Sequence, residues 1–226
     1  MNGFSWYLLC FGVPLILGLA VQGRLRSTFA KNSRVPVASG KTGADVAREI
    51  LDRNGLQSVP VQPSKDGPLS DHYDPRTRGV FLSEPVFAGR SVAATAVAAH
   101  EVGHAIQHAE SYAPMTVRSA IWPIAAFGSQ AWFFILIIGV IFQAFGLVWV
   151  ALIVFAAVVL FQLVTLPVEF NASRRALLQI RELGLVNDTE AVAARQTLTA
   201  AAMTYVAGAL ASIAQLLYFL MLFGRN

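Results

Sequence analysis

The sequence predicts a mainly α-helical membrane protein that crosses the bilayer four times and carries a small α+β region with a short β-hairpin. Of its 226 residues, 55% are hydrophobic and only 13% are charged, whereas about a quarter of the residues in a soluble domain carry a charge. The charge is also unevenly distributed, because no Lys, Arg, Asp, Glu or His occurs between Ile121 and Val168. This composition predicts that much of the chain faces lipid.

Four apolar segments are long enough to cross a bilayer as helices, which takes about 20 residues. They are residues 5–22, 121–142, 147–168 and 199–223. The second and third are separated by a short link, so we expect them to form an antiparallel helical hairpin. We interpret the first as an uncleaved anchor, because it lacks the preceding positive charge and the following cleavage site of a signal peptide.

The region 24–120 is predicted to fold outside the bilayer, beginning with a helix. Thr42 and Asp45 have the spacing of a capping box, which predicts a helix that ends near Asn54. Its expected buried stripe consists of Val46, Ile50 and Leu51.

Two strands and a long helix are expected in the rest of this region. Prolines break 57–67 into a loop or a short edge strand, and 69–73 and 79–82 are predicted strands joined by a turn. Ser91 is the expected N-cap of a helix that covers about 92–110.

The region 169–198 is predicted to lie outside the bilayer as well. An amphipathic helix is expected over about 172–183, ending near Gly184. Asn187 and Glu190 repeat the spacing of a capping box and predict a helix that continues into the fourth span.

The segment His100-Glu101-Val102-Gly103-His104 lies in the helix predicted over 92–110. Histidines four residues apart lie on one helical face, so both imidazoles can bind one zinc ion, and Glu101 is placed to take a proton from a zinc-bound water. The alternatives are chance and a structural zinc site. A structural site commonly uses cysteine, and the only cysteine, Cys10, lies in the first span. The pattern therefore predicts a metallohydrolase with a catalytic zinc.

A hydrolytic zinc usually has three protein ligands, and the sequence offers two main candidates for the third. His108 continues the same face but lies about 12 Å along the helix from His100, so we expect it beside the ligands or near the substrate. Glu169 directly follows an uncharged span, where an acid is costly unless it is paired or coordinated. The alternative for Glu169 is an ordinary ion pair with Arg174 or Arg175. Weaker candidates are Glu84, Glu110 and Asp74.

The hydrogen-bond donor that stabilises the oxyanion is not determined by the sequence. The candidates are His72, Tyr73, His108, Arg174 and Arg175. The strand that contains Tyr73 is expected either to bind a peptide by edge pairing or to be a purely structural hairpin.

Four segments together resemble the YugP-type neutral zinc metallopeptidases of bacterial membranes. They are residues 42–47, 70–76, 97–108 and 166–173. The resemblance implies a zincin-like catalytic region in which His100, His104 and Glu169 bind one zinc ion and Glu101 is the base. The related HtpX-like peptidases have an Asp four residues after the ligand Glu, where this chain has Ser173. We therefore expect Ser173 or Asn171 to orient a ligand histidine instead.

Sixteen of the seventeen Lys and Arg residues fall in 23–120 and 169–198, several of them next to the ends of spans. By the positive-inside rule, these regions and the zinc motif should face the cytoplasm, with both termini across a bacterial inner membrane. Cationic flanks next to anionic lipid explain the pI of 9.6, so no nucleic-acid partner is expected. The expected partners are the lipid bilayer and a membrane-associated or unfolded polypeptide substrate. A homo-oligomer or a membrane-protein partner is left open.

Two other functions compete with this interpretation. An intramembrane zinc protease would suit the Ala-rich stretch 92–99, but no Asp lies inside another apolar span to complete such a site. A non-catalytic membrane scaffold that contains zinc would not need Glu101.

Overall fold

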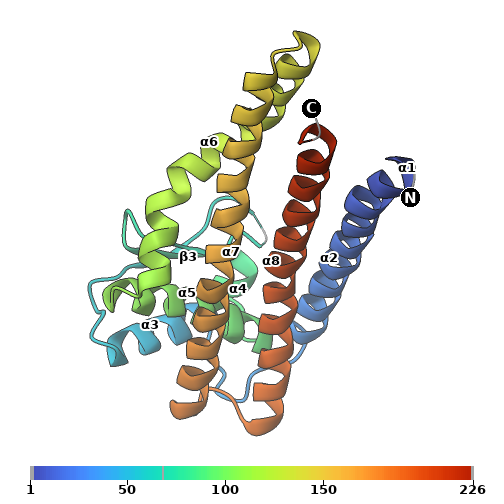
Figure 1. The fold of residues 1–226 in the computed structure, drawn as a ribbon. Coiled ribbons are helices and arrows are strands. Elements are labelled where there is room, and N and C mark those ends of the chain that lie inside the picture. Colours follow the sequence, from blue (N-terminus) through green and yellow to red (C-terminus); the bar gives the residue numbers. More distant parts are fainter. Residues whose placement is uncertain (1–2, 68, 225–226) are drawn as a thin grey trace. The chain divides into compact units, whose positions relative to one another are not determined.

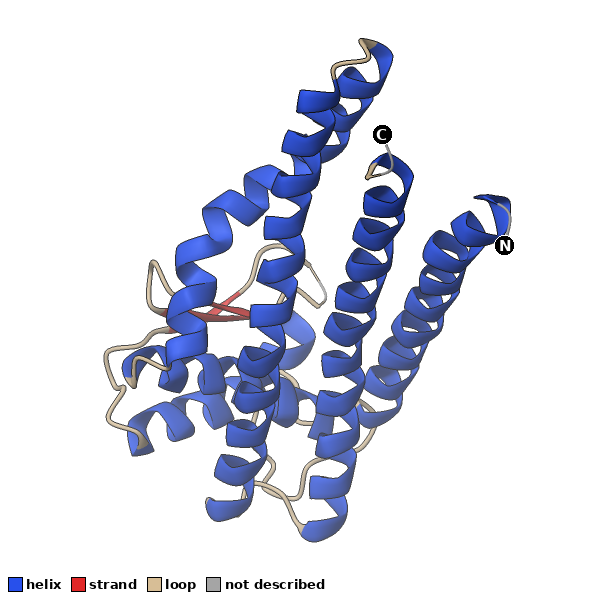
Figure 2. Cartoon of the chain, viewed as in Figure 1, coloured by secondary structure: helices blue, strands red, loops and turns tan. Residues whose placement is uncertain are grey.

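The computed structural model describes residues 3–67 and 69–224. They form two compact units, one built from residues 3–22, 113–167 and 204–224, the other from 23–112 and 168–203. Helices dominate both units, and the strands form one small sheet (Figure 2). The predicted fold class is confirmed: the protein is mainly α-helical, with four candidate membrane-spanning helices and a three-stranded sheet.

The four candidate spans are long helices whose apolar windows are only 11–33% buried, so most of their surface is available to lipid. The first combines α1 (Gly3–Tyr7), a wider π-helical turn η1 (Leu8–Gly12) and α2 (Val13–Asn32). The others are α6 (Ala113–Ile141), α7 (Phe145–Glu182) and α8 (Asp188–Phe223). All four helices begin before the apolar segments predicted from sequence, and the first and third also continue past the predicted ends.

The first unit contains the hairpin of α6 and the beginning of α7 (Figure 1). The helices approach closely at Gly139, where an added Cβ would lie 2.9 Å from the Val148 backbone nitrogen. Trp132 of α6 stacks on Phe155 of α7 with ring centroids 4.1 Å apart. Small residues and aromatic contacts therefore hold this part of the hairpin together, in a stretch, Ile121 to Val168, that contains no charged residue.

The helix predicted separately over 172–183 is the continuation of α7, so that boundary is wrong. Pro167 removes only one backbone donor, and α7 continues through it to Glu182. Gly184 then adopts a φ of +63°, a left-handed conformation that favours glycine and ends the helix where expected.

All three predicted helix caps are confirmed. Thr42 Oγ1 accepts a hydrogen bond from the Asp45 backbone N–H at 3.1 Å, which begins α3 (Gly43–Arg53). Ser91 caps α5 (Val92–Ala109), and Asn187 forms a reciprocal capping box with Glu190 at the start of α8. The predicted stripe of α3 is fully buried: Val46, Ile50 and Leu51.

The sheet of the second unit has the strand order β1-β3-β2. β2 (His72–Asp74) and β3 (Gly79–Leu82) form the predicted antiparallel hairpin, and β1 (Val61–Pro63) pairs parallel with β3 as an edge strand. β2 begins later than the predicted 69–73: Leu69 has a φ of +61°, which is not an extended conformation, and the Asp71 carboxylate accepts hydrogen bonds from the Ser83 N–H and hydroxyl. Ser83 precedes the short helix α4 (Glu84–Phe87). α5 packs against α3, β2 and β3, which places the zinc motif beside the sheet.

Candidate metal centre

The zinc motif lies in the middle of α5, after an Ala- and Val-rich beginning that is buried in the core of the second unit. The side chain of His100 keeps 14% of its surface exposed and that of His104 8%. α5 therefore presents both imidazoles at the margin of a packed core, where surrounding groups can hold their orientation.

The structure brings Glu169 of α7 to these two histidines. Ligand atoms of His100, His104 and Glu169 all lie within 4.8 Å of one another. The Glu169 carboxylate is 3% exposed, and its Oε2 lies 3.3 Å from His100 Nε2 and 3.7 Å from His104 Nε2. The predicted three-residue group is thus assembled from residues almost seventy positions apart.

These distances suit a zinc ion. With zinc–ligand bonds near 2.05 Å at a tetrahedral angle, two ligand atoms should be about 3.3 Å apart. The observed separations of 3.3 and 3.7 Å are close to that value. Two imidazole nitrogens and one carboxylate oxygen are also the donor set of many hydrolytic zinc sites.

Gly103 makes the approach of α7 to α5 possible. A Cβ added to Gly103 would lie 2.7 Å from the carbonyl oxygen of Ala172 and 3.2 Å from its Cα. Ala172 is fully buried and follows Glu169 by three residues on α7. The glycine therefore allows the backbone of α7 to come near enough for its carboxylate to reach both imidazoles.

Each imidazole has a hydrogen-bonding partner on its second nitrogen. Ser173 Oγ lies 3.2 Å from His100 Nδ1, as one of the two sequence alternatives predicts. Asn171 contacts Gln107 instead of a histidine. Gln107 Oε1 lies 3.0 Å from His104 Nδ1. Sequence analysis missed Gln107, whose only signal is its position one turn after His104.

Glu101 lies on the adjacent face of α5 and is buried, with 8% of its surface exposed. Burial is the main cause that raises the pKa of the Glu101 carboxyl from 4.5 to about 7. Nearby His100 lowers this pKa, nearby Glu169 and Asp71 raise it, and a hydrogen bond from the Tyr73 backbone lowers it slightly.

Tyr73 and His108 form a pair on the same face as Glu101, because His108 follows Glu101 by two helical turns. The Tyr73 hydroxyl and His108 Nδ1 share a hydrogen bond of 2.7 Å. The His72 side chain lies on the opposite face of β2 from Tyr73: it stacks on Phe81, and its Nδ1 lies 2.8 Å from the Ser70 carbonyl. The structure therefore brings Tyr73 and His108, but not His72, toward the zinc motif.

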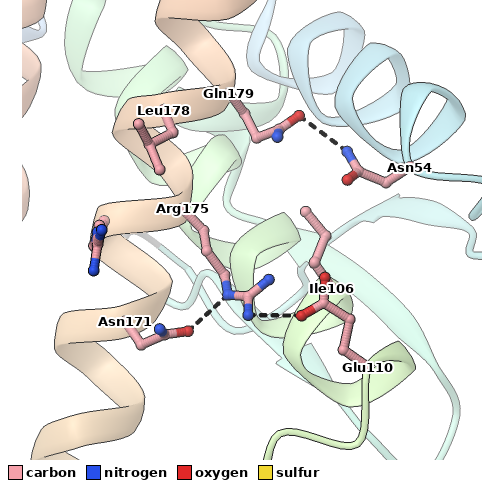
Figure 3. Close-up of a pocket in the computed structure, with 8 residues that line it drawn as sticks. Asn54, Ile106, Glu110, Asn171, Arg175, Leu178 and Gln179 are labelled. Carbon is pink, nitrogen blue, oxygen red and sulfur yellow. Dashed lines mark hydrogen bonds and ion pairs between the residues drawn. The ribbon is translucent and has the colours of Figure 1, made fainter.

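The remaining candidates lie elsewhere in the second unit. Arg175 donates to Asn171 Oδ1 at 2.7 Å and pairs with Glu110 at 2.7 Å (Figure 3). Asp74 pairs with Arg76, and Glu84 is exposed at the start of α4. Arg174 is exposed and lines a pocket of about 340 Å³ between α3, α5 and α7. The other residues that line this pocket are Asn54, Ile106, Glu110, Asn171, Arg175, Leu178 and Gln179.

Comparison with known proteins decides the family. A family model described as "Putative neutral zinc metallopeptidase" matches residues 7–224. The chain belongs to this family. It is also similar to "Putative membrane protease YugP" of Bacillus subtilis (strain 168), with 48% identity over 214 residues, 93% of this chain and 95% of that protein. No solved structure matches the chain.

The resemblance seen in the sequence is thereby confirmed. Membership of a zinc metallopeptidase family implies zinc, and the group of His100, His104 and Glu169 can hold it. Together with the four candidate spans, the comparisons identify a multi-pass membrane member of the neutral zinc metallopeptidase family.

Proposed function

We propose that the chain is a membrane-anchored zinc endopeptidase in which Glu101 is the general base. The convergence of His100, His104 and Glu169 within 4.8 Å is the observation that carries this proposal. The family membership and the similarity to a protein named as a membrane protease support peptide bonds as the target. One zinc ion per chain matches the single three-ligand group found among the residues that the structure describes.

The reaction requires a proton acceptor beside the bound metal. A zinc ion held by the three ligands would supply a Lewis acid that polarises the substrate carbonyl and lowers the pKa of water. Glu101 accepts the proton of the attacking water and passes it to the leaving amine nitrogen. Its buried position next to His100 supports this role, because burial raises the pKa of the carboxyl to about 7, which suits a group that accepts and passes on a proton near neutral pH.

Either Tyr73 or His108 is the proposed donor to the oxyanion, because with a neutral imidazole their mutual hydrogen bond leaves only one of them with a free hydrogen. Their mutual hydrogen bond holds both side chains on the Glu101 face of α5. Tyr73 belongs to β2, which lies at the edge of the sheet, where an extended peptide can add by main-chain hydrogen bonds. This combination supports a zincin-like catalytic region that binds polypeptides without strict side-chain selectivity.

The proposed substrates are membrane-associated or unfolded polypeptides, and the proposed location is a bacterial inner membrane with the site facing the cytoplasm. Cysteines introduced at the exposed positions Lys65 and Arg76 should resist a membrane-impermeant maleimide in intact cells and react after the cells are opened. A C10S background removes the native cysteine. Labelling of both positions in intact cells would reverse the proposed orientation.

The activity is tested with the purified full chain in detergent micelles and a quenched fluorescent peptide pool. Glu101→Gln should retain zinc and lose cleavage by several orders of magnitude, because the proton acceptor is removed while the ligands stay. Glu84→Gln is the matched control: it neutralises an exposed acid of the same unit and should leave cleavage unchanged. Full activity of Glu101→Gln would exclude the assigned base.

The same assay separates the alternatives. A non-catalytic zinc scaffold predicts that zinc-loaded wild type cleaves no peptide and unfolds when zinc is chelated. An intramembrane protease predicts cleavage within an apolar transmembrane peptide and none within a soluble peptide.

A further inference from the structure

Gln107 is a fully buried polar side chain between α5 and α7 that uses every polar atom of its amide. Its Oε1 lies 3.0 Å from His104 Nδ1, and its Nε2 donates to the Val168 carbonyl at 2.8 Å and to Asn171 Oδ1 at 3.0 Å. Burying an amide costs free energy unless its groups are paired. This amide is therefore held in one place by three partners from two helices.

The direction of these hydrogen bonds follows from Arg175, because a guanidinium can only donate. Arg175 Nε donates to Asn171 at 2.7 Å, so Asn171 presents its oxygen (Figure 3). That oxygen and the Val168 carbonyl can only accept, so Gln107 turns its NH₂ group toward both. Its Oε1 then faces His104, and His104 Nδ1 must carry the hydrogen.

The tautomer of His104 decides which nitrogen can bind a metal. A neutral imidazole with hydrogen on Nδ1 has its lone pair on Nε2, and Nε2 lies 3.7 Å from Glu169 Oε2. His100 is held differently. Its partner, the Ser173 hydroxyl, can donate or accept and so imposes no direction.

The NH₂ group of Gln107 is connected to the ligand Glu169 through the backbone of α7. Val168, whose carbonyl accepts from Gln107, directly precedes Glu169 on α7. One amide therefore orients one ligand and anchors the turn that carries another.

We propose that Gln107 is the positioning residue of the metal centre: it holds His104 as the Nδ1–H tautomer and anchors the turn of α7 that carries Glu169. This inference rests on the proposed zinc site, and its test does not depend on peptide cleavage. Hydrogen-bond partners of ligand histidines typically contribute 10- to 100-fold to metal affinity.

Zinc affinity of the full chain in detergent micelles is measured by competition with a chelating indicator. Gln107→Met keeps the length of the side chain and removes all three hydrogen bonds, so zinc should bind about 10- to 100-fold more weakly. Gln179→Met is the matched control. It makes the same exchange on α7 and removes a hydrogen bond to Asn54 at 3.0 Å that has no part in the metal centre, so affinity should stay within about threefold.

Equal zinc affinity in Gln107→Met and wild type would overturn the proposal, and so would an equal loss in both variants. In the zinc-loaded wild type, nitrogen-15 NMR of labelled histidines should show His104 protonated at Nδ1 and coordinated through Nε2. Coordination through Nδ1 would contradict the assignment. This measurement on wild type needs no variant, so it tests the assigned tautomer even if Gln107→Met does not fold.

Failure of the inference and failure of the proposed function give different results. Weaker zinc binding by Gln107→Met, with no peptide cleavage by zinc-loaded wild type, would refute the proposed peptidase activity and support the positioning role. Peptide cleavage by wild type with unchanged affinity in Gln107→Met would support the peptidase activity and refute the positioning role. Wild type that binds no zinc at these ligands would overturn both.

Discussion

Replacing Gly103 with alanine tests whether close helix packing assembles the metal centre. The new methyl group would lie 2.7 Å from the Ala172 carbonyl oxygen, in a position that the backbone of α7 occupies. A carbon–oxygen contact needs more than 3.0 Å, so α5 and α7 must separate by about 0.5 Å at this level. Neither helix can relieve the clash by turning a side chain, because the obstructing atoms belong to the backbone.

The separation should weaken zinc binding. Glu169 lies one turn from Ala172, so its carboxylate moves with the backbone. It moves away from His100 Nε2, which lies 3.3 Å from it in the wild-type structure. Overpacking of this kind costs about 1–3 kcal/mol, which corresponds to a loss of about 5- to 150-fold if the metal-bound state carries the full cost. Alanine also favours a helix by up to about 1 kcal/mol over glycine, but this gain is the same with and without zinc and does not enter the zinc affinity.

The assay is competition for zinc between the purified protein and a chelating indicator, supported by the absorption spectrum of the cobalt-substituted protein. Gly23→Ala is the control, because Gly23 also lies in a helix and a Cβ there would meet nothing within 4 Å. Its zinc affinity should equal that of wild type. If Gly103→Ala bound zinc as tightly as wild type, the close approach of α7 would not be what places the carboxylate.

Three further predictions follow from the site. Glu169→Gln should lower zinc affinity by at least about 10-fold, measured by the same competition, because a charged ligand is replaced by a weak neutral one. Tyr73→Phe should bind zinc normally but reduce kcat by about 10- to 1,000-fold if its hydroxyl stabilises the oxyanion; an unchanged kcat would exclude that role. In zinc-free protein, the raised pKa of Glu101 means that the folded state binds its proton more tightly than the unfolded state. The free energy of unfolding should therefore fall by up to about 3 kcal/mol as pH rises from 4.5 to about 7, and thermal melts of Glu101→Gln should lack this component.

The features that were predictable depend on neighbours in the chain. Thr42 with Asp45 and Asn187 with Glu190 form capping boxes because three residues separate the partners, a distance set by helix geometry. His100 and His104 share a face for the same reason. Glu169 was found by a different argument, the cost of an acid at the end of an uncharged span, and the structure places it at the two imidazoles.

Features that escaped prediction depend on distant residues or on competing local contacts. A glutamine within a helix normally lies on the surface, and Gln107 acquires its role from Val168 and Asn171, more than sixty residues away. The continuation of α7 through Pro167 and the late start of β2 were also missed. Local rules take a proline as the end of a helix, although it removes only one backbone donor. They also do not foresee that Asp71 hydrogen-bonds to Ser83, which lies in another segment of the chain.

The amino-acid sequence by itself determined the membrane class, the helix caps and the pair of imidazoles, because hydrophobic length and helical periodicity act over a few residues. Only the tertiary structure decided that α7 passes close enough to Gly103 for Glu169 to join that pair, and that the buried Gln107 amide lies against Nδ1 of His104. Both depend on backbone distances of a few ångströms between segments far apart in the chain, and these distances exist only once the helices have packed.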